Sequence, residues 1–246
     1  MWYETFFDDL YIKWQDNFDE NYQYECEKDA NDIYEYLGIK NTDKILDLCC
    51  GCGYHSIEFG KKGNNVVGMD LSKKMLEYAK YNAHNFKNIQ YIEQDIRSPI
   101  NDKFDFVFCF NTSLGYFDND YELENIFGKM YRAINLNGKF LIDVFNPFKF
   151  INNFKENLIF DIEGLSIYQK SKINLVNQEV QNSWTARKAE GSQIIDERTM
   201  KIRFYTAKEL IKFGNNAGFK FDRLIGDYKG KEYKVDSDRL ILVLKK

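Results

Sequence analysis

The stretch ILDLCCGCGYH, at residues 45–55, constrains the fold of this chain more than any other. A short apolar run ends at Leu48, a loop with Gly51 and Gly53 follows, and a helical pattern begins directly after it. Because glycine has no side chain, a cofactor can approach the backbone of such a loop where the next helix starts. The stretch is typical of a nucleotide-type site in an α/β fold, although on its own it is a weak signal.

The alternation of strand and helix patterns continues after this loop. Short apolar runs of strand length are separated by amphipathic stretches of helical period. We expect further strands over 65–69, 89–93, 104–110 and 139–145, and helices over 55–62, 72–85 and 121–134. Such a succession predicts a doubly wound α/β sheet.

The C-terminal part adds a helix and a hairpin. Thr206, with Glu209 three residues later, reads as a capping box that opens a helix ending near Gly218. Strands follow over 221–225 and 240–244, and we expect them to pair as an antiparallel hairpin. The predicted fold class is α/β: a doubly wound, Rossmann-like seven-stranded sheet with an antiparallel C-terminal hairpin and a β-rich inserted cap.

Two segments depart from this alternation. Residues 1–42 carry aromatic side chains at helical intervals, so we expect a helical N-terminal segment, which we call the lid. Residues 147–205 alternate apolar and polar positions without a crossover helix, which predicts the antiparallel strands of the inserted segment that we call the cap. The remaining residues, 43–146 and 206–246, should form the Rossmann-like cofactor-binding domain.

Composition narrows the function classes. The 246 residues carry a formal net charge of −4, so there is no basic excess for generic binding of nucleic acid. Hydrophobic residues make up 44% of the chain, yet no apolar run approaches the length of a membrane span, so we expect a globular protein without a membrane partner. The N-terminus has no basic stretch followed by an apolar one, and we expect no secretory signal. The oligomeric state stays open.

The number and spacing of the cysteines indicate the redox compartment of the protein and whether it binds a metal. There are five, and Cys49, Cys50 and Cys52 lie too close together for a set of mutual disulfides. An odd number of cysteines that cannot all pair as disulfides fits a reducing, cytoplasmic location. A structural zinc site needs four ligands, and no second Cys or His pair stands elsewhere in the sequence. We therefore predict no metal site.

Three successive predicted strands each end in an acid: Asp47, Asp70 and Asp95. The carboxyl ends of parallel strands share one edge of a sheet, where ligands of such folds bind. A carboxylate after the second strand can accept both hydroxyls of a ribose. A carboxylate after the third can take an exocyclic adenine amine while Ile96 covers the ring. Each acid alone has an ordinary structural explanation, but the ordered set of three favours an adenosine site.

With these features the sequence resembles the class I S-adenosylmethionine-dependent methyltransferases, strongly over residues 43–146 and more loosely over 206–246. The resemblance implies S-adenosyl-L-methionine as cofactor and a Rossmann-like domain. It also implies that the glycine loop contacts the methionine end of the cofactor and that the acids after strands two and three hold ribose and adenine. The cofactor-binding residues that it implies are Asp47, Cys49, Gly51, Gly53, Asp70, Leu71, Asp95, Ile96 and Phe110.

One position departs from the family pattern. The family often has a third glycine where this chain has Cys49. A small side chain is tolerated there, but we expect the backbone to lie slightly differently.

Two other classes stay open at this point. A nicotinamide dehydrogenase needs a third glycine where this chain has Ser56, has no stated use for Asp95, and cannot assemble its catalytic set from the two histidines. A cofactor-binding sensor or a noncatalytic partner subunit would carry the same cofactor motifs without turnover.

The acceptor side should follow the fourth strand. Asn111 and the run from Ser113 to Phe117 lie there, and they resemble small-molecule methyltransferases of the aminosugar N-methyltransferase branch rather than enzymes with an Asn/Asp-Pro-Pro-aromatic motif. The Asn-Pro-Phe run at residues 146–148 is similar to that motif, but it follows the fifth predicted strand, so we expect a turn there. The candidate catalytic residues are Tyr116, Asn111 and, from the lid, Tyr11, whose ring can lie over the sulfonium.

We therefore predict direct in-line methyl transfer to a small-molecule acceptor, an amine nitrogen or a hydroxyl. Residues 1–40 contain eleven acids and three bases, and a negative pocket rim attracts small cations while it repels phosphate backbones. Because the cap leaves the ligand-binding edge of the sheet, we expect Trp184 and Arg187 to meet the substrate. The alternative is an RNA or protein methyltransferase, since residues 201–246 carry twelve bases and six acids.

Overall fold

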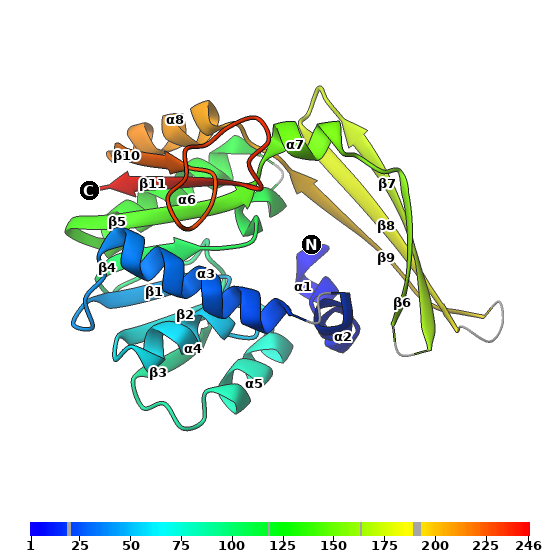
Figure 1. Cartoon of the computed structure of the whole chain (residues 1–246), viewed down its shortest axis with the longest axis horizontal. Coiled ribbons are helices and arrows are strands. Elements are labelled where there is room, and N and C mark those ends of the chain that lie inside the picture. The colour runs from blue at the N-terminus through cyan, green and yellow to red at the C-terminus, as the bar shows by residue number, and fades with distance from the viewer. Residues whose placement is uncertain (19–20, 118, 163, 189–192) are drawn as a thin grey trace.

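The fold is built on two separate β-sheets with the first part of the lid between them (Figure 1). The computed structural model describes residues 1–18, 21–117, 119–162, 164–188 and 193–246. None of the helices in these ranges is both long enough and apolar enough to cross a membrane.

The larger sheet has seven strands in the order β10-β11-β5-β4-β1-β2-β3. Strands β1 to β5 run parallel, and β11 pairs antiparallel with both β5 and β10. Its strands are β1 (Lys44–Leu48), β2 (Asn65–Asp70), β3 (Ile89–Glu93), β4 (Phe104–Cys109), β5 (Ile134–Phe145), β10 (Lys220–Ile225) and β11 (Arg239–Lys245). The predicted doubly wound seven-stranded sheet with an antiparallel C-terminal hairpin is confirmed.

Helices cover both faces of this sheet and separate most of the parallel strands. They are α3 (Tyr22–Leu37), α4 (Tyr54–Lys61), α5 (Lys73–Asn82), α6 (Asp120–Ala133) and α8 (Ala207–Ala217), with a short 3-10 helix, η1 (Ser113–Tyr116), after β4. The capping box at the start of α8 is present, because Thr206 accepts from the Glu209 backbone and the Glu209 carboxylate accepts from that of Thr206. The helix ends at Gly218, whose φ of 105° only glycine adopts freely.

The smaller sheet is antiparallel and has the order β6-β7-β8-β9. Its strands are β6 (Asn157–Ile162), β7 (Leu165–Asn174), β8 (Glu179–Lys188) and β9 (Ile194–Arg203), and they confirm the β-rich cap. The prediction of a turn at residues 146–148 is wrong. Asn146 instead caps a helix, α7 (Pro147–Asn152), because its side chain accepts from the Phe148 backbone and proline suits the first helical turn.

The lid begins with two short helices, α1 (Tyr3–Phe6) and α2 (Asp9–Phe18), which lie between the two sheets (Figure 1). Their apolar side chains pack on the inner face of the cap. The ring of Trp184 on β8 lies 5.3 Å from that of Phe6 and 4.8 Å from that of Trp14. The aromatic residues of the lid therefore form a second core with the cap, separate from the core of the large sheet.

Candidate functional site

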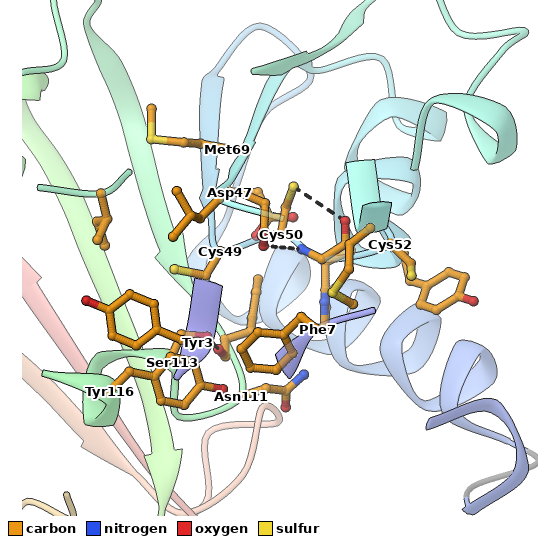
Figure 2. A pocket seen from close by; sticks show the side chains of 18 of the residues that line it. Tyr3, Phe7, Asp47, Cys49, Cys50, Cys52, Met69, Asn111, Ser113 and Tyr116 are labelled. Atoms are coloured by element: carbon orange, nitrogen blue, oxygen red, sulfur yellow. Dashed lines mark hydrogen bonds between the residues drawn. The ribbon is translucent and has the colours of Figure 1, made fainter. Parts of the chain in front are cut away.

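A cavity lies at the carboxyl edge of β1, β2 and β4, under the lid. It comprises about 1030 Å³ of space between atoms, part of it open to solvent. In Figure 2 the rings of Tyr3, Phe7 and Tyr116 gather on one side of it, opposite Asp47 and the cysteine loop. The predicted site residues that line it are Tyr11, Asp47, Cys49, Gly51, Asp70, Leu71, Asp95, Ile96, Phe110, Asn111 and Tyr116.

Asp47, at the end of β1, is only 1% exposed. Its Oδ2 accepts a hydrogen bond of 2.6 Å from the Ser56 hydroxyl at the start of α4. Burial raises the pKa of Asp47 to about 7, and the nearby charge of Asp70 acts in the same direction. A cation in the cavity would favour the ionised carboxylate and lower this pKa again.

Asp70 joins the glycine loop to the start of α5. Its Oδ2 accepts from the Gly51 backbone at 2.8 Å, and its Oδ1 accepts from the Ser72 backbone at the same distance. Burial raises the pKa of Asp70, although these backbone donors work against the shift. In the parts of the chain that the structure describes, neither Asp70 nor Asp47 has an ion-pair partner, so both carboxyl groups stay available to a cationic ligand.

The cysteine loop takes a glycine-like path at its first residue. Cys49 has a φ of 55°, in the left-handed region that favours glycine. This conformation costs a side-chain-bearing residue of this kind about 1–2 kcal/mol, and the loop keeps it despite the missing glycine. Gly53 does not line the cavity. A Cβ at this position would lie 2.3 Å from the Tyr91 hydroxyl oxygen on β3, too close for any side chain. Gly53 is needed for helix packing on β3.

Asp95 is held by Arg97. The guanidinium donates to both carboxylate oxygens, with Nη2 2.6 Å from Oδ2, and the Arg97 backbone donates to Oδ1 at 2.7 Å. These hydrogen bonds from Arg97 lower the pKa of Asp95. Asp95 is thus an ionised, fixed acceptor at the end of the cavity that Ile96 and Phe117 close with apolar surface.

The lid supplies one wall of the cavity. Tyr3, Phe7, Tyr11 and Gln15 all line it and lie four residues apart. The chain bends at Phe7, between α1 and α2, so this stripe does not belong to one continuous helix. Tyr11 packs between other rings, 4.8 Å from Phe7, and burial raises the pKa of its hydroxyl.

Two successive carbonyl groups of the lid accept hydrogen bonds from different parts of the fold. The Phe6 carbonyl accepts from Arg198 of β9 at 2.9 Å. The Phe7 carbonyl accepts from the Ser72 hydroxyl at 2.7 Å, and Ser72 also donates to Asp70. The lid is therefore anchored both to the cap and beside the predicted ribose site.

The loop after β4 forms the other wall. Asn111 and Thr112 have φ angles of 56° and 67°, so two successive residues are left-handed. For the β-branched Thr112 this conformation is a genuine outlier and costs about 1–3 kcal/mol. The Asn111 Nδ2 donates to the Tyr22 hydroxyl at 2.8 Å. The next lining aromatic, Tyr116, packs 4.9 Å from Trp2 of the lid.

The cap residues expected to meet substrate lie elsewhere. Trp184 is 3% exposed, packs against the lid aromatics, and donates its indole N–H to Gln169 at 3.0 Å. The Arg187 guanidinium lies 5.4 Å from the ring centre of Tyr168. Neither lines the cavity, because the lid fills the space between the inner face of the cap and the edge of the large sheet.

Sequence reasoning missed several lining residues. The four-residue spacing of the lid stripe could have identified three of them, but the others come together only in the fold. Buried His55 is one: it stacks on Phe110 at 4.1 Å, and burial lowers its pKa to about 4. The lining residues that were not assigned to the site from the sequence are Tyr3, Phe7, Gln15, Tyr22, Cys50, Cys52, Tyr54, His55, Met69, Met75 and Gln94. Ser113 and Phe117 also line the cavity, and they belong to the run already expected on the acceptor side.

Comparison with known proteins shows that the chain, including part of this site, is similar to methyltransferases. Residues 45–138 match the family model described as "Methyltransferase domain". A putative methyltransferase of Bacillus subtilis, YqeM, is 27% identical over 217 residues, which cover 85% of this chain and 86% of that protein.

Solved structures share the whole fold. A S-adenosylmethionine-dependent methyltransferase from Clostridium acetobutylicum superposes with a TM-score of 0.81 at 21% identity, over 96% of this chain and 99% of that one. CalS10 of Micromonospora echinaspora, an amino pentose methyltransferase solved with its cofactor, gives a TM-score of 0.65 at 18% identity, over 91% and 90% of the two chains.

The cavity also suits the cofactor of these enzymes chemically. The methionine end of S-adenosylmethionine carries an ammonium, a carboxylate and a positive sulfonium, and the other end carries a ribose and a flat adenine ring. Asp47 supplies a carboxyl group for a positive group, Asp70 supplies one that can accept hydrogen bonds from ribose hydroxyls, and Ile96 and Phe117 supply apolar surface for the ring. The described residues include no group of three or more His, Cys, Asp or Glu side chains that could hold a metal ion.

Proposed function

We propose that this chain, an S-adenosylmethionine-dependent methyltransferase, transfers the methyl group to a small-molecule acceptor. The acceptor atom is an amine nitrogen or a hydroxyl oxygen, and the site favours the amine. The observation that carries the proposal is the covered cavity. Side chains of the lid line the same space as Asp47 and Asp70, and the lid is fixed from two sides by Ser72 and Arg198. A cavity roofed in this way accepts a small molecule more readily than a folded macromolecule.

Residues at the ends of β2 and β3 would hold the adenosine end of the cofactor. Asp70 would accept hydrogen bonds from the ribose hydroxyls, Asp95 would accept one from the adenine amine, and Leu71 and Ile96 would cover the ring. The glycine loop with Cys49, together with Asp47 and Phe110, surrounds the methionine end. A cofactor can come close to the Gly51 backbone because glycine has no side chain, and a Cβ there would lie 3.1 Å from Met75 Cε.

Charge favours an amine over a phosphate-bearing acceptor. Asp47, Asp70 and Asp95 line the cavity, whereas no Lys or Arg of the described chain does. None of the residues outside the described ranges is a Lys or Arg, so they cannot add a positive charge. The likeness to CalS10, which acts on an amino pentose, supports the same acceptor class.

The bound cofactor would supply an activated methyl group, and the protein's task is alignment, which can contribute on the order of 7–11 kcal/mol. The Asn111 Nδ2 is committed to Tyr22, which leaves Oδ1 to accept an N–H of the acceptor. Tyr11 and Tyr116 present ring faces that attract a cation by roughly 0.5–2 kcal/mol each. The acceptor amine must be neutral before it attacks. His55 lines the cavity and adds no positive charge there, because burial lowers its pKa to about 4.

A transfer assay tests the proposal. The purified protein is incubated with methyl-labelled S-adenosylmethionine and three matched pairs of probes: glucosamine and glucose, ethanolamine and ethylene glycol, tyramine and tyrosol. In parallel it receives the small-molecule, RNA and protein fractions of a cell extract. We expect label in the small-molecule fraction and on amines before their hydroxyl partners.

Each other outcome contradicts a defined part of the proposal. Label in RNA or protein alone would make the chain a macromolecular methyltransferase. Cofactor binding by calorimetry without label in any fraction would identify a noncatalytic cofactor-binding protein.

A further inference from the structure

The turn at Asn111 and Thr112 is held in place by the ion pair between Asp143 and Arg239. Asp143 lies on β5, and its side chain is 0% exposed. The Arg239 guanidinium on β11 donates from Nε to Oδ1 and from Nη2 to Oδ2, both at 2.6 Å. Ile241 stands opposite Asp143 in the sheet register, so Arg239 occupies the diagonal position on the same face.

The same aspartate fixes the backbone of the turn. Its Oδ2 accepts from the Asn111 N–H at 2.8 Å, and its main-chain carbonyl accepts from the Thr112 N–H at 2.9 Å. The Thr112 hydroxyl in turn accepts from the Phe145 N–H at 3.0 Å. Two successive left-handed residues without glycine persist only where the surroundings determine them, and these three bonds do so.

The conformation of the turn decides where the Asn111 side chain lies. The side chain reaches the cavity and bonds to Tyr22 of the lid. An extended backbone at this position would break both N–H bonds to Asp143 and redirect the carboxamide. The bidentate fork of Arg239 matters because it fixes the orientation of the carboxylate, which a point charge does not do.

We propose that Asp143 and Arg239 are positioning residues for methyl transfer: their ion pair holds the left-handed turn that aims the Asn111 carboxamide at the acceptor. The inference rests on the proposed function, because it assumes that Asn111 meets the acceptor. It assigns a role in the reaction to two residues that lie outside the cofactor motifs and do not line the cavity in the described chain.

The principal variant is Arg239→Lys, which keeps the charge and loses the fork. The matched control is Lys139→Gln, which removes the Lys139–Asp222 ion pair; Lys139 lies on β5, four residues before Asp143. The first readout needs no acceptor: hydrogen exchange of the Asn111 side-chain amide by ¹⁵N NMR, with the signal assigned by its loss in Asn111→Ala. We expect exchange to accelerate at least tenfold in Arg239→Lys and to stay within twofold of the native protein in the control.

The second readout is turnover with the best amine of the probe panel. We expect Arg239→Lys to lower kcat at least tenfold while the Kd for S-adenosylmethionine, by calorimetry, changes less than twofold. In the Asn111→Ala background the same substitution should have no further effect on kcat, because the pair acts through Asn111. A structural role alone would give an additive loss that follows global stability.

Unchanged Asn111 exchange and unchanged kcat in a folded Arg239→Lys protein would overturn the inference. If no probe is methylated, the acceptor class fails, while the exchange measurement still decides whether the pair positions Asn111. If Arg239→Lys does not fold, the double variant Asp143→Asn with Arg239→Gln leaves no buried charge unpaired and takes its place in both measurements.

Discussion

Arg198 of the cap and Asp8 of the lid form a two-point ion pair, with Nη1 2.9 Å from Oδ1 and Nη2 3.0 Å from Oδ2. The same carboxylate accepts from the backbone of Leu10 and Tyr11 at 3.1 Å each, in the first turn of α2. One residue of the cap thus holds the helix that carries Tyr11 over the cavity. The cap is thus joined to the site through the lid, and none of its described residues lines the cavity.

Loss of the Arg198–Asp8 ion pair should weaken cofactor binding. We expect Arg198→Gln to raise the Kd for S-adenosylmethionine about fivefold, or about 1 kcal/mol, a modest value because Asp8 is half exposed and its charge is screened. Calorimetry measures it, with Arg187→Gln on the neighbouring strand β8 as the control that should leave Kd unchanged. Equal affinities in all three proteins would show that the lid stays closed without the pair.

Asp70→Ala should lower cofactor affinity by about 1.5–3 kcal/mol, because a charge-assisted contact to the ribose is lost. The variant also releases the Gly51 and Ser72 backbones, so affinity alone does not identify the contact. A 2′-deoxy cofactor analogue separates the two effects. It should bind the native protein more weakly than the cofactor itself and bind Asp70→Ala equally; a deoxy penalty of the same size in both proteins would contradict the assignment.

The Asp47 carboxyl should make the cofactor-free protein less stable as the pH rises. Its pKa is raised in the fold, so its contribution is fully present below about pH 4 and is lost as the pH passes through about 7. One such proton gives a slope of up to about 1.4 kcal/mol per pH unit in the free energy of unfolding. Cofactor affinity should rise over the same window, as the charged carboxylate becomes available.

Urea unfolding and calorimetry between pH 5 and about 8 check both trends. Asp47→Asn should flatten the affinity profile. Asp29 on α3, whose pKa burial also raises to about 7, supplies the control: Asp29→Asn should reduce the stability slope without changing the pH dependence of binding, since Asp29 does not line the cavity. A cofactor affinity independent of pH in the native protein would contradict the expectation.

Tyr11 should recognise the charge of the sulfonium. We expect Tyr11→Leu, which keeps an apolar side chain and removes the ring, to weaken S-adenosylmethionine binding by roughly 0.5–2 kcal/mol and to affect the uncharged S-adenosylhomocysteine less. Tyr11→Phe retains the ring and should bind both ligands as the native protein does. An equal loss for both ligands in Tyr11→Leu would mean that Tyr11 only packs the lid.

Local sequence determined the large sheet and most of the cofactor edge. The alternation from Ile45 onward reports a two-residue strand period and a 3.6-residue helix period, both properties of neighbouring residues. Parallel strands then bring their carboxyl ends to one edge, so Asp47, Asp70 and Asp95 had to meet once the order of strands was recognised. The same local logic located the capping box at Thr206.

Tertiary structure alone decided how the lid, the cap and the acceptor loop meet. Trp184 faces the lid rather than the cavity, because burial of an aromatic ring depends on which surface packs opposite it. The pairs Arg198–Asp8 and Arg239–Asp143 join residues 190 and 96 positions apart. No local period encodes such contacts. They form only when packing has brought distant elements together, and only then does a buried carboxylate such as that of Asp143 gain its charged partner.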